Sequence, residues 1–404
     1  MRPISKPDAQ RAGRRGVSRG TGMAVAFGGF HFRAPAMNLS ADVMPVTFDP
    51  SLEREEPSEA TTVEDMVKTF VGMARTVAET EGHAFRAVHA KGQGLLRGQL
   101  IVHGELPATF AQGLFARPAV YDALVRLSSP PAEQLPDSVS TPRALALKVL
   151  GVPGERLPEA LGPDAQDFLM VNGPAFSRPD PRGFLKDVQL LASTTEKSPR
   201  GKEVLSAVLR GAEHVLEAIG AESAKLKSLG GHPKVHPLGD TYFSQTPYLF
   251  GPYIAKFSLQ PVSPALTALT GEAMEADGDD AQRLSVARFL SAQMAPVEWA
   301  LRVQLCVNTD EMPIEDASVE WPEDMSPWVT VATLSVAPQD SWQGDATQAE
   351  EDALAFSPWN GLAAHRPLGG VNRARKIVMA ASREFRSAFN RCPIHEPVSR
   401  RGVS

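Results

Sequence analysis

Strict alternation of apolar and polar side chains in residues 298–307 is the feature that most constrains the fold. On one side the alternation places Trp299, Leu301, Val303, Leu305 and Val307. On the other it places Glu298, Arg302 and Gln304. Because successive side chains of a strand point to opposite faces, this predicts a strand with one face in a core. The alternation recurs over residues 328–336, which predicts a second strand of the same kind.

Further strands and helices are spread along the chain. Alternating side chains between turn-forming residues predict strands over Gln99–His103, Ala144–Val149 and Phe168–Val171. Apolar residues at helical spacing predict helices over Val63–Glu81 and within residues 201–230. The strands are not each followed by a helix of crossover length, and no Gly-x-Gly-x-x-Gly turn opens a helix. The pattern therefore favours an α+β fold with an antiparallel sheet over a parallel α/β fold.

Composition limits the range of partners. The 404 residues carry a net charge of −6, which gives no concentrated basic face for nucleic acid, and no apolar run approaches the length of a membrane span. Two isolated cysteines, Cys306 and Cys392, predict neither a disulfide framework nor a zinc site and favour a reducing, cytoplasmic setting. A small-molecule ligand is the expected partner.

The chain ends are expected to lie outside the folded domain. Residues 1–60 are interpreted as a disordered leader, 61–395 as the domain, and 396–404 as a tail. Arg14-Arg15 suggests a twin-arginine export signal, but the apolar stretch that follows is short and interrupted by glycine, His31 and Arg33. We therefore favour a leader, or a start codon placed too early, over an export signal.

A stripe of four residues near the C-terminus suggests a ligand site. Arg375, Met379, Ser382 and Arg386 are spaced by four, three and four residues, so a helix would align them on one face. Either Met379 packs inward while the arginines reach solvent, or the stripe faces an anionic planar ligand. From spacing alone, the first reading is favoured.

Three more segments carry chemically useful residues. His89 lies in Arg86-Ala-Val-His-Ala-Lys-Gly92, where glycine allows close approach, and Arg126 and Ser128 share one face of an expected strand. Asn172 ends an apolar strand at a Gly-Pro turn. Each has a purely structural explanation, so none supports a functional conclusion by itself.

Taken in order, these segments resemble the haem catalases, and the compact catalase-related peroxidases in particular. The similar segments are Arg86-Ala-Val-His-Ala-Lys-Gly-Gln-Gly94, Arg126-Leu-Ser128, Thr141-Pro-Arg143, Asn172-Gly-Pro174, Tyr253-Ile-Ala-Lys-Phe257 and Phe356-Ser-Pro358. The resemblance spans residues 85–386. It implies a catalase-like antiparallel β-barrel with surrounding helices and a C-terminal proximal helix.

The resemblance also implies site residues for haem b. His89 is the expected distal acid/base, Ser128 its hydrogen-bond partner, and Asn172 the distal asparagine, although alignment on Pro174 would place Val171 there instead. The residues expected to contact haem are Arg86, Val88, Arg126, Phe184, Arg375, Met379 and Arg386. Met379 stands where the family has its tyrosine iron ligand, and His365 or water are alternatives for that position.

The implied function is a haem protein that acts on hydrogen peroxide or organic hydroperoxides. A thioether is a weaker donor than a phenolate, so Met379 is expected to weaken catalase turnover. Two alternatives stay open: an enzyme for fatty-acid hydroperoxides, with a lipid channel near Val88, Phe176 and Phe184, and a silent haem-binding or haem-free protein. Members of the family self-associate, which implies a homo-oligomer.

Overall fold

The computed structural model describes residues 44–139, 141–195, 234–274 and 278–399. Its strands are β1 Lys91–Val102, β2 Ala119–Ser129, β3 Ala144–Leu150, β4 Gln166–Val171, β5 Tyr242–Phe243, β6 Tyr248–Phe250, β7 Tyr253–Pro261, β8 Val297–Leu305 and β9 Val329–Val336. Its α-helices are α1 Glu59–Glu81, α2 Pro181–Thr195, α5 Pro264–Thr267, α6 Ala281–Ser291, α7 Asp345–Ala353 and α8 Gly370–Asn390. Short 3-10 turns are η1 Pro50–Leu52, η2 Gly113–Phe115, η3 Pro237–Gly239 and η4 Ala363–His365.

The described strands close into an antiparallel barrel. Hydrogen-bonded neighbours run in the order β5-β4-β3-β2-β1-β9-β8-β7, and β5 also pairs with β7, so eight strands form a ring. β6 pairs with β7 outside that ring. The predicted α+β fold with a catalase-like antiparallel barrel is confirmed. Barrel closure removes exposed sheet edges and leaves alternate residues to fill the interior.

The barrel interior is filled by the apolar halves of the alternating strands. Trp299, Leu301, Val303 and Leu305 of β8 belong to this core together with Leu147 of β3. Four phenylalanines of the core, Phe115, Phe168, Phe250 and Phe257, contact one another or the ring of His365. The strand alternation seen in the sequence therefore corresponds to the inward face of the barrel.

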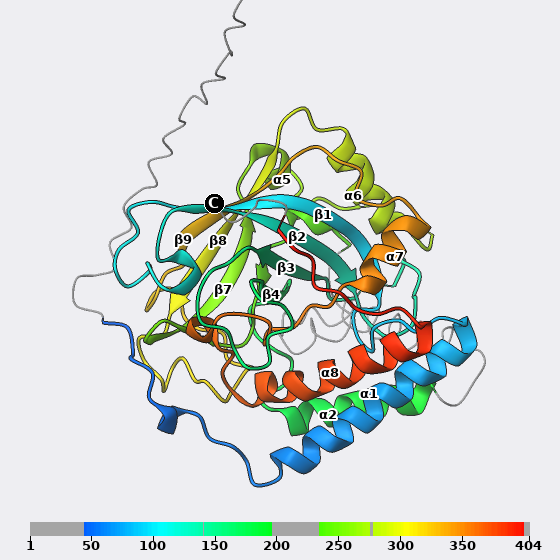
Figure 1. Cartoon of the computed structure of the whole chain (residues 1–404), viewed down its shortest axis with the longest axis horizontal. Helices are drawn as coiled ribbons and strands as arrows, with labels where there is room; N and C mark the ends of the chain where they lie inside the picture. The colour runs from blue at the N-terminus through cyan, green and yellow to red at the C-terminus, as the bar shows by residue number, and fades with distance from the viewer. Residues whose placement is uncertain (1–43, 140, 196–233, 275–277, 400–404) are drawn as a thin grey trace, which may run out of the picture. The chain divides into compact units, whose positions relative to one another are not determined.

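Helices α1, α2 and α8 form a layer on one side of the barrel, at the bottom of the view in Figure 1. α1 buries the stripe Val63, Met66, Phe70, Met73 and Val77, whose spacing of three or four residues is that of one helix face. The helix ends at Gly82, whose φ of 71° is the left-handed conformation that favours glycine. α1 begins four residues earlier than the sequence predicted.

The N-terminal boundary predicted at residue 60 was wrong for residues 44–60. The amide of Val46 donates to Cys306 O at 2.8 Å, and that of Phe48 donates to Pro252 O at 2.8 Å. Both side chains pack against a second apolar cluster that contains Trp321. Apolar residues within the supposed leader thus join a core. Residues 1–43, and the helix predicted within 201–230, lie outside the described residues.

The C-terminal boundary at residue 396 also differs, because residues 393–399 dock on the outside of the barrel. We call these residues the C-terminal strap. Within the strap, Glu396 forms an ion pair with Lys148 of β3 at 2.6 Å, and Lys148 also pairs with Asp167 of β4 at 2.8 Å. Asn360 donates to Glu396 at 3.1 Å. The strap therefore covers a buried charge on the outer face of the barrel.

Among the described residues, no helix combines the length and apolar character that crossing a membrane requires.

Candidate functional site

His89 lies in the loop between α1 and β1, within residues 84–90, which we call the histidine segment. Its φ of 51° is uncommon for a residue with a side chain. Arg126 of β2 stabilises this conformation, since Nη1 donates to His89 O at 3.0 Å and Nη2 donates to Ala90 O at 3.3 Å. A strand arginine thus fixes the loop that presents the imidazole.

The imidazole of His89 has a buried polar atom without a partner. Nδ1 is buried and forms no hydrogen bond with any described residue. Burial, with the positive charges of Arg126 and Arg375, lowers the pKa of His89 from 6.5 to about 3. The imidazole is therefore neutral at pH 7 and can accept a proton.

The predicted hydrogen bond between Ser128 and His89 is absent. Ser128 is buried on β2, but its register partner is Gly92, three residues beyond His89. The strand pairing shifts between Gly92 and Gly94, where β1 has a bulge, and the histidine segment precedes the strand. Sequence alternation could not predict this offset, because the bulge and the left-handed turn change the direction of the side chains.

Arg86, Arg126 and Arg386, which we call the arginine cluster, meet at the C-terminal end of α7. Arg86 Nη2 donates to Glu351 O at 2.8 Å and to Leu354 O at 3.0 Å, while Arg386 Nη2 donates to the same Leu354 oxygen at 2.8 Å. The last carbonyls of a helix attract cations. Arginines from three distant parts of the sequence thus converge beside the histidine segment.

Two carboxylates that the sequence did not single out join the arginine cluster. Glu351 is fully buried, with Oε1 at 3.2 Å from Arg126 Nε and Oε2 at 3.9 Å from Arg86 Nη1. Asp352 Oδ2 lies 3.0 Å from Nε2 of His83. Both belong to an acidic run of α7 that is typical of an exposed helix face. Three arginines that converge need negative charge nearby, and this need is the one signal that points to these two carboxylates.

Helix α8 turns its predicted stripe toward the histidine segment. Ser382 Oγ accepts a hydrogen bond from the amide of Ala87 at 3.2 Å, and the charge of Arg375 acts on His89. Met379 lies between these two residues at helical spacing, so it belongs to the same face. The half-buried thioether is thus directed to the same side as the residues that contact the histidine segment.

Arg375 is held by neutral groups. Its Nη1 donates to Thr246 Oγ1 and to Asn372 Oδ1, both at 3.2 Å, and the guanidinium lies 5.7 Å from the centroid of Phe176. None of the ion pairs among the described residues includes Arg375. Burial lowers its pKa, which is the direction expected of a cation without a carboxylate partner.

Asn172, predicted as the distal asparagine, is held by two protein partners. Its Oδ1 accepts from the amide of Arg143 at 2.9 Å, and its Nδ2 donates to Asp240 Oδ2 at 3.3 Å. Arg143 also pairs with Asp240. Both ends of the amide group thus have protein partners, and they tie β3 to η3.

Phe184 contributes to helix packing. Its ring centroid lies 4.9 Å from that of Phe176 and 6.2 Å from that of Phe70, in the cluster shared by α1, α2 and α8. Val88, beside His89, is 38% exposed although it is apolar. An exposed valine next to an unpartnered imidazole provides an apolar surface for a ligand.

Two alternatives for the proximal side can be compared with the structure. His365 is fully buried, accepts from the amide of Leu114 at Nε2 and lies 3.4 Å from Leu249 O at Nδ1, so both ring nitrogens are engaged inside the barrel. The positive charge of Arg375 acts on Tyr248 of β6, but burial raises the pKa of Tyr248 to about 12. It is a neutral phenol at pH 7. Neither residue offers a free anionic ligand.

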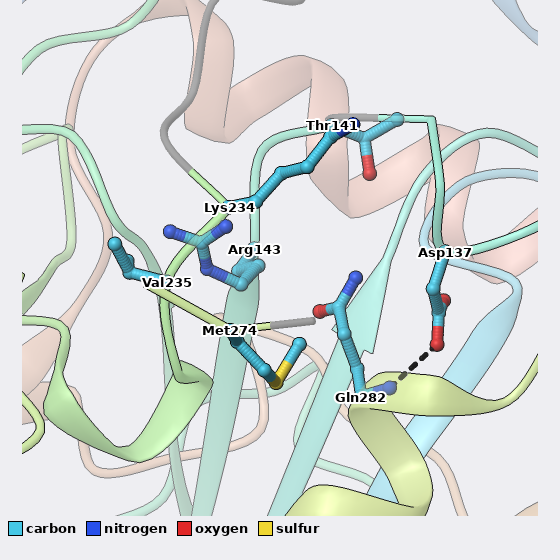
Figure 2. Close-up of a pocket in the computed structure, with 7 residues that line it drawn as sticks. All are labelled: Asp137, Thr141, Arg143, Lys234, Val235, Met274 and Gln282. Atoms are coloured by element: carbon cyan, nitrogen blue, oxygen red, sulfur yellow. Dashed lines mark hydrogen bonds between the residues drawn. The ribbon is translucent and has the colours of Figure 1, made fainter. Parts of the chain in front are cut away.

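A separate cavity lies at the start of α6 and is shown in Figure 2. Its lining residues are Asp137, Thr141, Arg143, Lys234, Val235, Met274 and Gln282. The volume of about 10 Å³ suits a single water molecule at most. Asp137 accepts from the amide of Gln282 at 2.7 Å, as the dashed line in Figure 2 indicates. This cavity is too small to hold a ligand larger than a water molecule.

Comparison with known proteins gives structural matches only. No protein-family model matches the chain, and no curated protein matches it. Among solved structures, a fungal catalase aligns with a TM-score of 0.53 at 18% identity over 77% of this chain, and catalase A from Saccharomyces cerevisiae with 0.53 at 16% over 78%. A bacterial catalase aligns with 0.54 at 16% over 89%. The fold is that of the catalases.

The catalase-like fold covers only part of these larger neighbours. The alignments span 61%, 64% and 67% of the three catalase chains, in the order given above. At 16–18% identity the likeness establishes architecture and not activity.

The residues around His89 fit a haem group in three respects. The imidazole has an unpartnered buried nitrogen, three arginines converge where carboxylates could be paired, and Arg375 carries a charge without a carboxylate. They differ from a simple propionate site in one respect, because the buried carboxylate of Glu351 already contacts the arginine cluster.

Proposed function

We propose that this chain is a haem-binding protein of catalase fold that reacts with hydroperoxides and turns over hydrogen peroxide slowly. The observation that carries the proposal is the neutral imidazole of His89, whose buried Nδ1 has no partner and whose backbone is fixed by Arg126. A buried polar atom without a partner is costly in a fold that serves structure alone.

The arginine cluster would pair with carboxylate on the haem, with Val88 against the porphyrin. Arg375 and Met379, on α8, would line the same site, and Met379 is the side chain that we propose would hold the iron. Bound haem would supply the redox chemistry that cleavage of a peroxide O–O bond requires.

His89 moves the proton in this reaction. Since Nδ1 is buried, we assign the transfer to Nε2. The neutral ring would take a proton from one peroxide oxygen and return it to the other, which departs as water or as an alcohol. With a pKa lowered to about 3, the ring is unprotonated at any pH near neutrality, so its nitrogen lone pair is free.

Met379 accounts for the slow turnover. A thioether brings no negative charge, so it donates less electron density than an ionised tyrosine. Arg375, which forms no ion pair among the described residues, is left without an anionic neighbour on α8. Peroxidase-type reaction with hydrogen peroxide or organic hydroperoxides is the activity retained.

The test is reconstitution with ferric haem followed by visible spectroscopy and oxygen evolution. The wild type is expected to develop a Soret band and low catalase activity, and Met379→Tyr to shift the spectrum and raise oxygen evolution. Ile377→Tyr is the matched control, since Ile377 is 52% exposed on the same helix. A wild type without a Soret band, or one as active as Met379→Tyr, contradicts the proposal.

The proposal includes membership of the compact catalase-related subgroup and assembly as a homo-oligomer. Both follow from the family resemblance of the sequence motifs. Reaction of the reconstituted protein with hydrogen peroxide and with a fatty-acid hydroperoxide, followed by product analysis, identifies the substrate class.

A further inference from the structure

Glu351 is a buried carboxylate at the centre of the arginine cluster. It lies in the last turn of α7, and its side chain has no exposed surface. Its oxygens are 3.2 Å from Arg126 Nε and 3.9 Å from Arg86 Nη1. The chain thus provides its own carboxylate at the place where a ligand carboxylate would be paired.

The contacts of Glu351 are those of a counter-ion and not of a hydrogen-bonded structural pair. Neither of its oxygens forms a hydrogen bond with a described residue, and the Nε of Arg126 forms none either. A buried ion pair gains stability when its geometry allows hydrogen bonds, often two in parallel for arginine. Without such hydrogen bonds, Glu351 acts on Arg126 and Arg86 through its charge, at 3.2 Å and 3.9 Å.

Gly92 provides the space that Glu351 occupies. A Cβ on residue 92 would lie 2.7 Å from the Cδ of Glu351, which is an overlap. The glycine that follows the histidine segment therefore admits the carboxylate, and the two residues form one feature.

The charges of the cluster leave one positive charge uncompensated. Arg86, Arg126 and Arg386 contribute three positive charges, and Glu351 and Asp352 contribute two negative charges. Arg386 Nη1 is 3.9 Å from Asp352, whose Oδ2 also lies 3.0 Å from Nε2 of His83. Without Glu351, the same arginines would carry two uncompensated charges.

We propose that Glu351 is an internal counter-ion that sets the site to pair with one ligand carboxylate instead of two. This inference rests on the proposed function, because it concerns the ligand of the same site. A second ligand carboxylate would have to share Arg126 with Glu351. Two carboxylates that contact the same buried guanidinium repel each other strongly. Porphyrins with one free carboxylate are therefore accepted as well as those with two.

The test measures equilibrium binding of ferric haem, its monomethyl ester and its dimethyl ester. The wild type is expected to bind haem and the monomethyl ester with about equal affinity, within ~3-fold, because only one carboxylate is paired. Glu351→Gln is expected to bind haem about 10-fold more tightly, and the dimethyl ester unchanged, since relief of repulsion requires a charged ligand. Glu350→Gln is the matched control, because Glu350 is on the same helix and pairs with exposed Arg97.

Equal tightening for haem and dimethyl ester, or no tightening for haem, overturns the proposal.

A second readout needs no ligand. Thermal unfolding of the ligand-free Glu351→Gln protein is expected at a lower temperature than the wild type, with partial recovery in added sulfate, because its arginines lack a counter-ion. If no porphyrin binds any variant, the proposed function fails, and the unfolding result alone decides whether Glu351 is a counter-ion. Unchanged unfolding rejects that role.

Discussion

Ser382 Oγ accepts a hydrogen bond from the amide of Ala87 at 3.2 Å, and this contact joins α8 directly to the histidine segment. Residues 295 positions apart in the sequence thereby fix the spacing between the helix that carries Met379 and the loop that carries His89.

Replacing Ser382 tests whether this contact holds the loop. Ser382→Ala leaves the nearly buried amide of Ala87 unpaired, so the unfolding free energy is expected to fall by about 1 kcal/mol. Amide hydrogen exchange at residue 87 should accelerate, whereas exchange inside the barrel should not. Ser382→Thr keeps the acceptor and serves as the control. Unchanged exchange at residue 87 contradicts the prediction.

The pKa of His89 predicts a pH dependence of stability. In the folded chain the pKa is lowered from 6.5 to about 3, so between these values the unfolded state binds more protons at this residue. The contribution of His89 to stability is complete above pH 6.5 and is lost as the pH falls toward 3. Denaturant unfolding across this window should show a shallower pH slope for His89→Gln than for the wild type. Equal slopes would mean that His89 is not buried as described.

Gly92 and Glu351 should behave as a coupled pair. Gly92→Ala introduces the overlap with the Glu351 carboxylate and should destabilise the chain by about 1–3 kcal/mol. Combining it with Glu351→Ala removes the overlapping group, so the double variant should lose less than the sum of the two single losses. Urea titration of the four proteins measures the coupling. Additive losses would show that the two residues are independent.

Much of the fold was predictable because strand alternation is a local property. The segments 298–307 and 328–336 predicted β8 and β9 within two residues, and helical spacing predicted α1 and the α8 stripe. Contacts made by apolar residues of the first sixty positions were not predictable, because Val46, Phe48 and Leu52 join a core whose other members come from residues 249–368.

The sequence predicted arginines that the structure brings together, but not the carboxylates that accompany them. The arginines could be identified because they occur in recognisable motifs. Glu351 could not, since an acidic residue on a short polar helix is normally exposed. The Ser128 contact failed because a β-bulge and a left-handed residue separate His89 from the regular strand register.

The buried lysine of β3 gives a prediction for the barrel wall. Lys148→Met leaves Asp167 and Glu396 buried without their cation and should cost about 3–5 kcal/mol. Arg97→Met, which breaks the exposed pair with Glu350, should cost less than about 1 kcal/mol. Urea unfolding of both variants provides the comparison. Similar losses for the two would contradict the assignment of Lys148 as a buried structural charge.

The C-terminal strap has a consequence for the order of events during protein synthesis. Glu396 supplies the second carboxylate to Lys148, and the amide of His395 donates to Ala353 O at 2.9 Å, at the end of the helix that carries Glu351. Both residues emerge from the ribosome after every barrel strand. During synthesis the outer face of the barrel at Lys148 therefore stays uncovered until residues 393–399 have emerged, and their contact beside Glu351 forms after the barrel strands have been made.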